Sequence, residues 1–292
     1  MSVAPDRSSL ESSPSQPVAG VCGIIAGAGS FPFHVARAAK RQGLTVVAIG
    51  LEGWVDSGLK THVDAYEEVA VGRVGQLINR LKTHQVRQAV MAGKVTKRVL
   101  LDPRVIFDAE TIKLLSRAKE FTVNQLLGAL GERLAEEGIT LLDSAVFLQD
   151  ELCPEGVLSR RAPTTEERED IRVGVRAARQ LAALDVGQTV VVKGKVVVAV
   201  EALEGTDATI TRAGQLAGEG CVIVKTASPA QDMRFDLPVL GLQTVAVAKA
   251  AGARCLAVEA HRTLLLEKAA VLAHADDAKL SLVGIKIPIV SS

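Results

Sequence analysis

The chain has 292 residues, of which 34 are Lys or Arg and 33 are Asp or Glu, so its formal net charge is +1. This near-neutral balance argues against a dedicated nucleic-acid binder, because such a protein needs a basic face to displace counterions. A hydrophobic fraction of 48% is too high for a disordered chain, and one Trp, one Tyr and six Phe are too few for base-stacking platforms.

The sequence shows no sign of export or of a membrane span. Residues 1–18 are rich in Ser and Pro and lack the apolar core of a signal peptide, so we expect a disordered tail. No run approaches the ~18 uninterrupted apolar residues that a spanning helix needs, which predicts a cytoplasmic protein with at most peripheral membrane contact. The four cysteines lack a CxxC spacing, which is typical of reduced structural thiols. They are Cys22, Cys153, Cys221 and Cys255.

Residues 19–149 alternate between short apolar runs and segments with helical spacing, an alternation typical of βαβ units. Strands are expected at residues 21–26, 44–51, 67–71 and 88–91, and helices at residues 30–43, 74–81, 109–117 and 123–138. This pattern predicts an N-terminal Rossmann-like domain with an open sheet that binds a nucleotide.

Residues 150–163 interrupt the alternation with two prolines and a glycine, and we interpret them as a linker. Thr164 and Glu167 then form a capping box at the start of a helix that runs to about residue 184. A hairpin is expected at residues 189–203, followed by further helices and strands. Residues 164–290 are therefore expected to form a C-terminal α/β domain with a mixed sheet, which completes a two-domain α/β fold and carries the catalytic residues.

Two loops at predicted strand ends could meet a phosphate. Gly27 and Gly29 lie in a turn between a strand and a helix, where free backbone N–H groups and the helix dipole favour an anion. A plain structural turn explains them equally well, because Pro32 replaces the third glycine of the dinucleotide fingerprint. Lys94 follows another strand end and is either a phosphate contact or an exposed loop lysine.

The most informative stretch contains Asp232, Arg234 and Asp236. If this stretch is extended, the three side chains share one face, because side chains alternate with a period of two. One interpretation is a surface ion-pair ladder on an edge strand. The other is a catalytic site, in which carboxylates hold Mg²⁺, Arg234 clamps a phosphate and an aspartate orients or deprotonates water.

Further candidates flank this stretch. Glu204 and Asp207 supply oxygen atoms at a predicted strand end and are candidate metal ligands together with Asp236. Thr206 is a candidate for substrate binding, although Thr206 or Asp207 could equally be only a helix N-cap. The other candidates for substrate binding are Lys225 and Gln231. Because GxSxG, HExxH and Walker A motifs are absent, an enzyme built on this chain would use carboxylates and a metal.

The order and spacing of five motifs resemble the UDP-2,3-diacylglucosamine pyrophosphatase family of the LpxI type. The matching stretches are residues 23–32, 92–95, 184–188, 200–207 and 229–241. The resemblance implies an N-terminal Rossmann-like domain, a linker and a C-terminal α/β domain with the lipid substrate held between the domains. It also implies Mg²⁺-dependent hydrolysis of UDP-2,3-diacylglucosamine to UMP and 2,3-diacylglucosamine 1-phosphate in lipid A biosynthesis.

The resemblance assigns the essential aspartate to Asp236, with Arg234 beside it, and makes Gly27, Gly29 and Lys94 candidates for the nucleotide end. One departure concerns residues 124–125, where many relatives carry Asp-Asp and this chain carries Asn-Gln. A non-catalytic protein that binds a nucleotide sugar or a lipid on the same scaffold is therefore the alternative. We also consider a homodimer.

Overall fold

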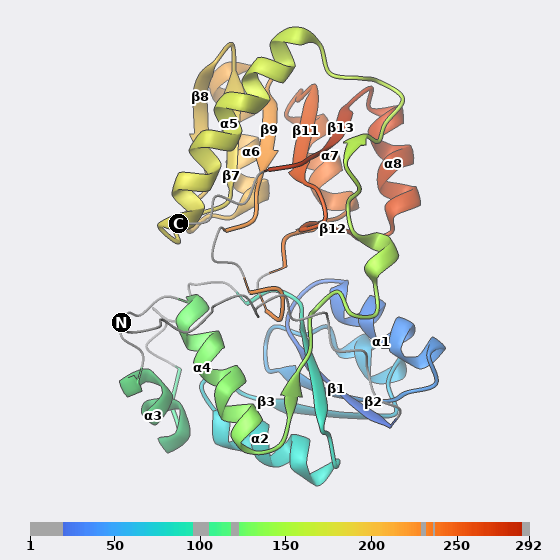
Figure 1. Cartoon of the computed structure of the whole chain (residues 1–292), viewed down its shortest axis with the longest axis vertical. Coiled ribbons are helices and arrows are strands. Elements are labelled where there is room, and N and C mark those ends of the chain that lie inside the picture. Colours follow the sequence, from blue (N-terminus) through green and yellow to red (C-terminus); the bar gives the residue numbers. More distant parts are fainter. Residues whose placement is uncertain (1–19, 96–104, 118–122, 229–231, 236, 288–292) are drawn as a thin grey trace, which may run out of the picture.

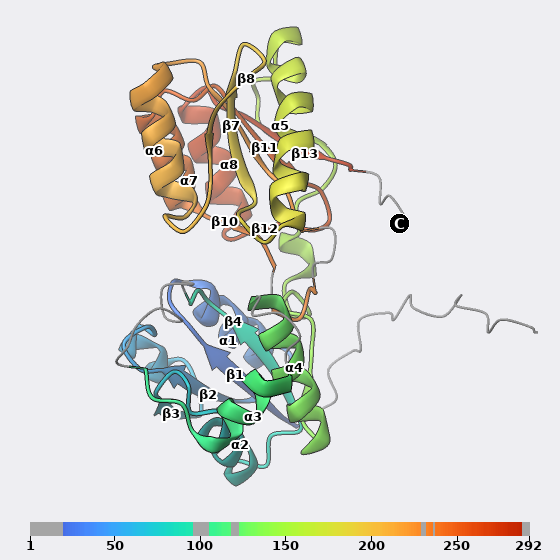
Figure 2. The ribbon, with the colours of Figure 1, turned by 90° about the vertical axis from the view of Figure 1, so that its left-hand side faces the viewer.

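The computed structural model describes residues 20–95, 105–117, 123–228, 232–235 and 237–287, and it contains two α/β domains stacked along the long axis (Figures 1 and 2). The elements of the first domain follow the predicted alternation. They are β1 (Val21–Ala26), α1 (Phe31–Arg41), β2 (Thr45–Leu51), η1 (Ser57–Thr61), β3 (Ala65–Val69), α2 (Val74–Thr83), β4 (Gln88–Ala92), α3 (Ala109–Arg117), α4 (Val123–Glu136) and β5 (Thr140–Leu141).

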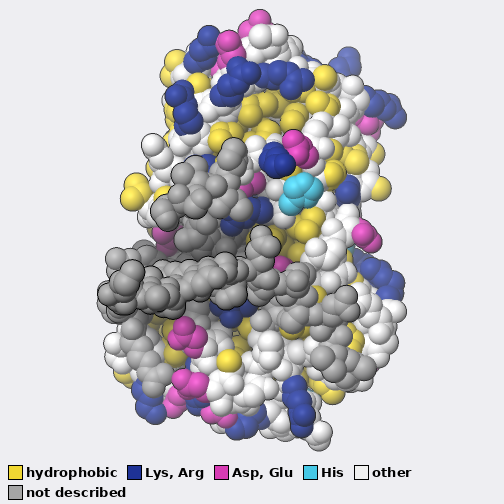
Figure 3. All heavy atoms as spheres, in the orientation of Figure 1, with side chains coloured by type: hydrophobic (Ala, Val, Ile, Leu, Met, Phe, Trp, Pro, Cys, Tyr) yellow, Lys and Arg dark blue, Asp and Glu magenta, His cyan; other side chains and the backbone are white. Residues whose placement is uncertain are grey.

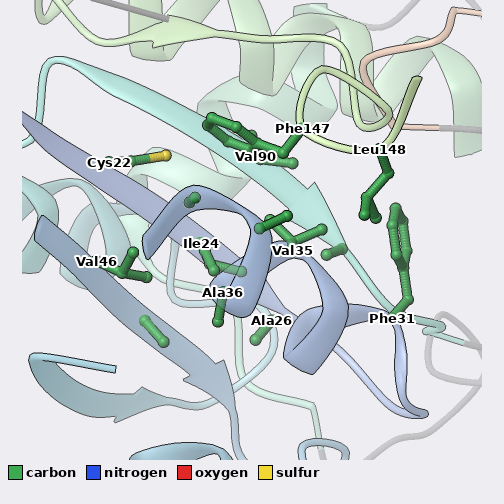
Figure 4. Packing of buried hydrophobic residues seen from close by; sticks show 14 of the residues in the cluster. Cys22, Ile24, Ala26, Phe31, Val35, Ala36, Val46, Val90, Phe147 and Leu148 are labelled. Atoms are coloured by element: carbon green, nitrogen blue, oxygen red, sulfur yellow. The ribbon is translucent and has the colours of Figure 1, made fainter. Parts of the chain in front are cut away.

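All strands of the first sheet are parallel and lie in the order β3-β2-β1-β4-β5, so the predicted Rossmann-like open sheet is confirmed. Alternate residues of a buried strand serve opposite faces. Ile24 packs with Val35 of α1, whereas Ile25 packs with Ile78 of α2 and Leu134 of α4 (Figure 4 shows the α1 side). The strand order reverses between β1 and β4, which places a ligand crevice at their carboxyl ends.

The second domain is built on a mixed sheet, as predicted. Helix η3 (Gln149–Glu151) lies at the end of the first domain. The elements of the second domain are β6 (Gly156–Val157), α5 (Thr165–Ala183), β7 (Thr189–Lys193), β8 (Val196–Val200), α6 (Thr206–Ala217), β9 (Val222–Lys225), β10 (Val239–Leu240), α7 (Leu242–Ala250), β11 (Cys255–Glu259), β12 (Leu264–Leu265), α8 (Lys268–Asp277) and β13 (Ser281–Ile285). The main sheet has the order β6-β13-β11-β9-β7-β8, and β10 and β12 form a separate parallel pair. Helix α5 covers one face of the main sheet, and α6, α7 and α8 cover the other (Figure 2).

The structure confirms two predictions that rest on residues close together in the sequence. Thr164 and Glu167 form the predicted capping box at the start of α5, and β7 and β8 form the predicted antiparallel hairpin. The segment interpreted as a linker is more structured than its composition indicates. Its strand β6 pairs with β13, so residues 156–157 belong to the second sheet.

All four cysteines are buried and free, as expected for structural thiols, and burial raises the pKa of Cys22 to about 12. Among the residues that the structure describes, we find no helix with the length and apolar composition that crossing a bilayer requires. On the face seen in Figure 3, acidic and basic side chains both occur on each domain.

A matched pair of glycines tests the packing of α5. A Cβ atom on Gly174 of α5 would lie 2.5 Å from Cγ2 of Val224, whereas one on Gly128 of α4 would meet no atom of the described residues within 4 Å. We expect Gly174→Ala to lower the free energy of unfolding by about 1–3 kcal/mol through overpacking. Gly128→Ala should raise it by up to about 1 kcal/mol, because alanine favours the helix. Urea unfolding measures the free energy of unfolding of each variant. Equal values for the two variants would contradict the close packing of α5 against Val224.

Candidate active site

Residues 232–235, from the segment between β9 and β10, lie against the first domain (Figure 1, orange). These residues form a turn that is bonded to Ser144, which lies just after β5. The backbone N–H of Ser144 donates to the carbonyl of Met233 at 3.0 Å, and its hydroxyl lies 2.8 Å from the carbonyl of Arg234. The same hydroxyl lies 2.9 Å from the carbonyl of Met91 in β4. The turn therefore sits at the carboxyl end of the first sheet, where open α/β sheets bind ligands.

The prediction of an extended strand through Asp232 and Arg234 is wrong. The backbone N–H of Phe235 donates to the carbonyl of Asp232 at 3.2 Å, and that of Arg234 donates to the Asp232 carboxylate at 3.0 Å. An aspartate that accepts from the backbone two residues later stabilises a turn, which overrides the alternation of polar and apolar residues. Phe235 packs against the α2/α4 side of the first domain.

The predicted ion pair of Asp232 and Arg234 is present. The guanidinium donates from Nε to both carboxylate oxygens, at 2.9 and 3.0 Å, and from Nη2 to Oδ2 at 2.5 Å. Burial raises the pKa of Asp232, but the hydrogen bonds and the charge of Arg234 outweigh it and hold that pKa below its ordinary value. The Arg234 side chain keeps 41% of its surface exposed, so it remains accessible to an anion.

A second carboxyl group interacts electrostatically with Asp232. Asp143 lies next to Ser144, and its Oδ1 accepts the backbone N–H of Ala145 at 2.7 Å. Burial raises the pKa of Asp143, the hydrogen bond from Ala145 opposes this shift, and the negative charge of Asp232 raises the pKa further. The charges of Asp143 and Asp232 thus interact where residues 232–235 contact the first domain.

The glycine turn after β1 is bonded to the loop after β4. The N–H groups of Gly27 and Ala28 donate to the carbonyls of Ala92 and Lys94, at 2.8 and 2.9 Å, and are used within the protein. A Cβ atom on Gly27 would lie 2.8 Å from the Lys94 carbonyl, so this glycine is needed for the close approach of the two loops. The Lys94 side chain is exposed beside them.

A pocket of about 700 Å³ opens beside this turn, within the size range of small-molecule sites. It combines aromatic side chains with charged ones and includes Glu267, which reaches in from the second domain. Its lining residues are Gly29, Ser30, Phe33, His34, Arg37, Trp54, Val55, Asp56 and Glu267. Gly29 has a φ of +93°, a conformation that favours glycine. His34 lies 3.3 Å from Glu267 and joins the two domains at the pocket.

In the second domain, Lys225 and Thr206 meet at the carboxyl ends of β9 and β8. Lys225 is only 6% exposed, and its Nζ donates to the Thr206 hydroxyl at 3.0 Å. That hydroxyl donates to the buried Glu201 carboxylate at 2.9 Å. Gly205, with a φ of +86°, is the N-cap of α6, so the interpretation of Thr206 or Asp207 as the N-cap is wrong.

The candidate metal ligands Glu204 and Asp207 have protein partners. Glu204 pairs with Arg212 at 2.7 Å, and Asp207 accepts the Thr244 hydroxyl at 3.0 Å. Asp236 and the substrate candidate Gln231 lie outside the described residues. Within the described ranges, no three or more His, Cys, Asp or Glu side chains form a group that could hold a metal ion, so the ligand set that includes Asp236 stays a prediction.

Comparison with known proteins assigns both halves of the chain to one family. The model of the LpxI N-terminal domain matches residues 21–151, and that of the LpxI C-terminal domain matches residues 154–283. The chain belongs to the LpxI family. It is 30% identical over 274 residues to the UDP-2,3-diacylglucosamine pyrophosphatase LpxI of Caulobacter vibrioides, covering 90% of this chain and 96% of that protein.

Sequence reasoning missed three polar groups at or near this candidate site. Asp143 and Ser144 follow β5, which has only two residues and no detectable periodicity. The third is Glu259, which is 2% exposed and accepts the backbone N–H of Ala227 at 2.8 Å. Their position in the sequence could have indicated them. Asp143 and Ser144 follow an apolar run, and Glu259 ends one.

The carboxyl group of Asp143 gives a pH-dependent prediction. Its folded pKa is raised, so its ionisation destabilises the folded state, and this penalty is absent below the unfolded pKa and grows as pH rises through the folded pKa. Asp143→Asn keeps the acceptor for Ala145 and should raise the melting temperature at pH 7, where the carboxyl group of the wild type is ionised.

The measurement is thermal unfolding in a chelating buffer at pH 7 and near pH 4, where the gain should shrink. Asp277→Asn, a change of an exposed aspartate on α8, serves as the control. A gain that is the same at both pH values would contradict the raised pKa.

Proposed function

We propose that this protein hydrolyses the diphosphate of UDP-2,3-diacylglucosamine to UMP and 2,3-diacylglucosamine 1-phosphate, a step of lipid A biosynthesis. Membership of the LpxI family and the printed name of the Caulobacter relative support this substrate. The observation that carries the proposal is the 232–235 turn, which presents Arg234 at the carboxyl end of the first sheet. The substrate would lie between the two domains.

Arg234 and Asp232 have tasks suited to a diphosphate. The Arg234 guanidinium neutralises charge on the phosphate oxygens, and Asp232 fixes its plane through two hydrogen-bonding nitrogens. Water attacks one phosphorus, the bridging P–O bond breaks, and the second phosphate leaves with the bond electrons. Asp236 would accept the proton of the water or contribute to a metal site.

A Mg²⁺ ion fits the chemistry of the donors at this place. Asp143 offers hard carboxylate oxygens and Asp236 adds another carboxylate in sequence, whereas Asp232 would have to share its oxygens with Arg234. When bound, Mg²⁺ would supply Lewis-acid neutralisation of the diphosphate. The alternative set, Glu204 and Asp207 with Asp236, would require Glu204 to leave Arg212.

The pocket beside Gly29 is the best candidate for the uridine end. Trp54 and Phe33 provide aromatic surface for a base, and Arg37 and Asp56 provide polar groups. The pocket and the 232–235 turn are linked, because the Gly27 loop is bonded to the loop after β4, and Met91 of β4 contacts Ser144.

Release of UMP from the UDP-lipid in the presence of Mg²⁺ tests the activity. Wild-type protein should turn over and stop when the metal is chelated, and Asp236→Ala should lower kcat by about 100-fold or more, since acid–base groups contribute at least that much. Asp277→Ala, an exposed aspartate on α8, should match wild type.

Normal turnover by Asp236→Ala would remove that residue from catalysis. Binding of the UDP-lipid without release of UMP at any Mg²⁺ concentration would favour the alternative of a non-catalytic binding protein.

Calorimetry with UMP tests the pocket. Trp54→Ala should raise Kd by about 10-fold, because stacking of a base on an aromatic ring contributes about 1–3 kcal/mol. Trp54→Phe keeps an aromatic ring and should bind within about 3-fold of wild type. Equal affinity of wild type and Trp54→Ala would place the nucleoside elsewhere.

A further inference from the structure

The 232–235 turn belongs to the second domain in sequence but is held by the first domain. Ser144 contacts two successive carbonyl groups of the turn, those of Met233 and Arg234. The same residue contacts the carbonyl of Met91, near the end of β4. One side chain therefore joins the turn that carries Arg234 to the strand that leads into the Lys94 loop.

Ser144 is suited to fixing a position. It is 2% exposed, so water does not compete effectively for its hydrogen bonds. Its hydroxyl has one proton and two carbonyl acceptors, Met91 at 2.9 Å and Arg234 at 2.8 Å, while its N–H serves Met233. The hydroxyl therefore donates to one of these carbonyls at a time or shares its proton between them, and its loss removes this link between the turn and β4.

The other end of the segment is fixed in the second domain. The buried carboxylate of Glu259 accepts the N–H of Ala227, and Arg262 donates to the Ser228 carbonyl at 3.1 Å. The stem is thus held by β11 and the loop after it, whereas the tip is held by Ser144. The position of Arg234 depends on both anchors.

We infer that Ser144 is a positioning residue for diphosphate hydrolysis, acting by holding the Arg234 and Asp232 ion pair against the carboxyl end of β4. This inference rests on the proposed function. Ser144 acts through the turn and does not touch the reacting atoms. A displacement of the ion pair of about 1 Å can lower the rate by about 100-fold, because the charge no longer lies at the phosphate.

The test compares three variants in the full-length protein. Ser144→Ala should lower kcat for UMP release by about 10–100-fold and leave KM within about 3-fold, and Ser144→Thr, which keeps the hydroxyl, should recover most of the loss. The control is Ser159→Ala. Ser159 is also buried, at 8% exposure, but it bonds Arg161 and Leu282 within the second domain.

Amide hydrogen exchange supplies a readout that does not depend on activity. Exchange of Met233 to Phe235 should accelerate in Ser144→Ala and stay at the wild-type rate in Ser159→Ala. Wild-type kcat and exchange in Ser144→Ala, or equal losses of kcat in Ser144→Ala and Ser159→Ala, would overturn the inference. Failure of the wild type to release UMP would instead refute the proposed function.

Discussion

The contact between the 232–235 turn and Ser144 is the constraint on which the candidate active site depends. It places Arg234, a residue of the second half of the sequence, at the carboxyl end of a sheet built by the first half. The hydrogen bonds of Ser144 are polar, and the contact between the two domains also includes apolar side chains. Leu264 and Leu266 of the second domain pack in the same cluster as Phe31 and Leu148 of the first, and Figure 4 shows Phe31 beside Leu148.

The two domains contribute unequal parts to this arrangement. The first domain supplies the parallel sheet, the two hydrogen-bonded loops and the pocket lined by Trp54. The second supplies the turn with its ion pair and the buried network of Lys225, Thr206 and Glu201. A substrate with a nucleoside at one end and a diphosphate in its middle matches this division, since aromatic surface and positive charge lie on connected segments.

The aliphatic composition explains how so few aromatic residues suffice. Strands rich in Val, Ile and Ala are buried on both faces, as parallel strands between helical layers require. Part of this apolar surface closes the contact between the domains, where Leu237 and Val239 pack against the first domain. The 48% hydrophobic fraction thus supports both the separate cores and their junction.

The sequence by itself determined the features that depend on near neighbours: the long strands and helices, the capping box at Thr164, the hairpin of β7 and β8, and the LpxI motifs in their order. Only the tertiary structure decided where these motifs meet. Gly27 is required because the loop after β4 approaches it closely. Residues 232–235 form a turn, although the alternation of polar and apolar residues there favours an extended strand. Asp143 and Ser144 gain their importance from residues about 90 positions away, because hydrogen bonds and charges act through space while sequence patterns record only neighbours.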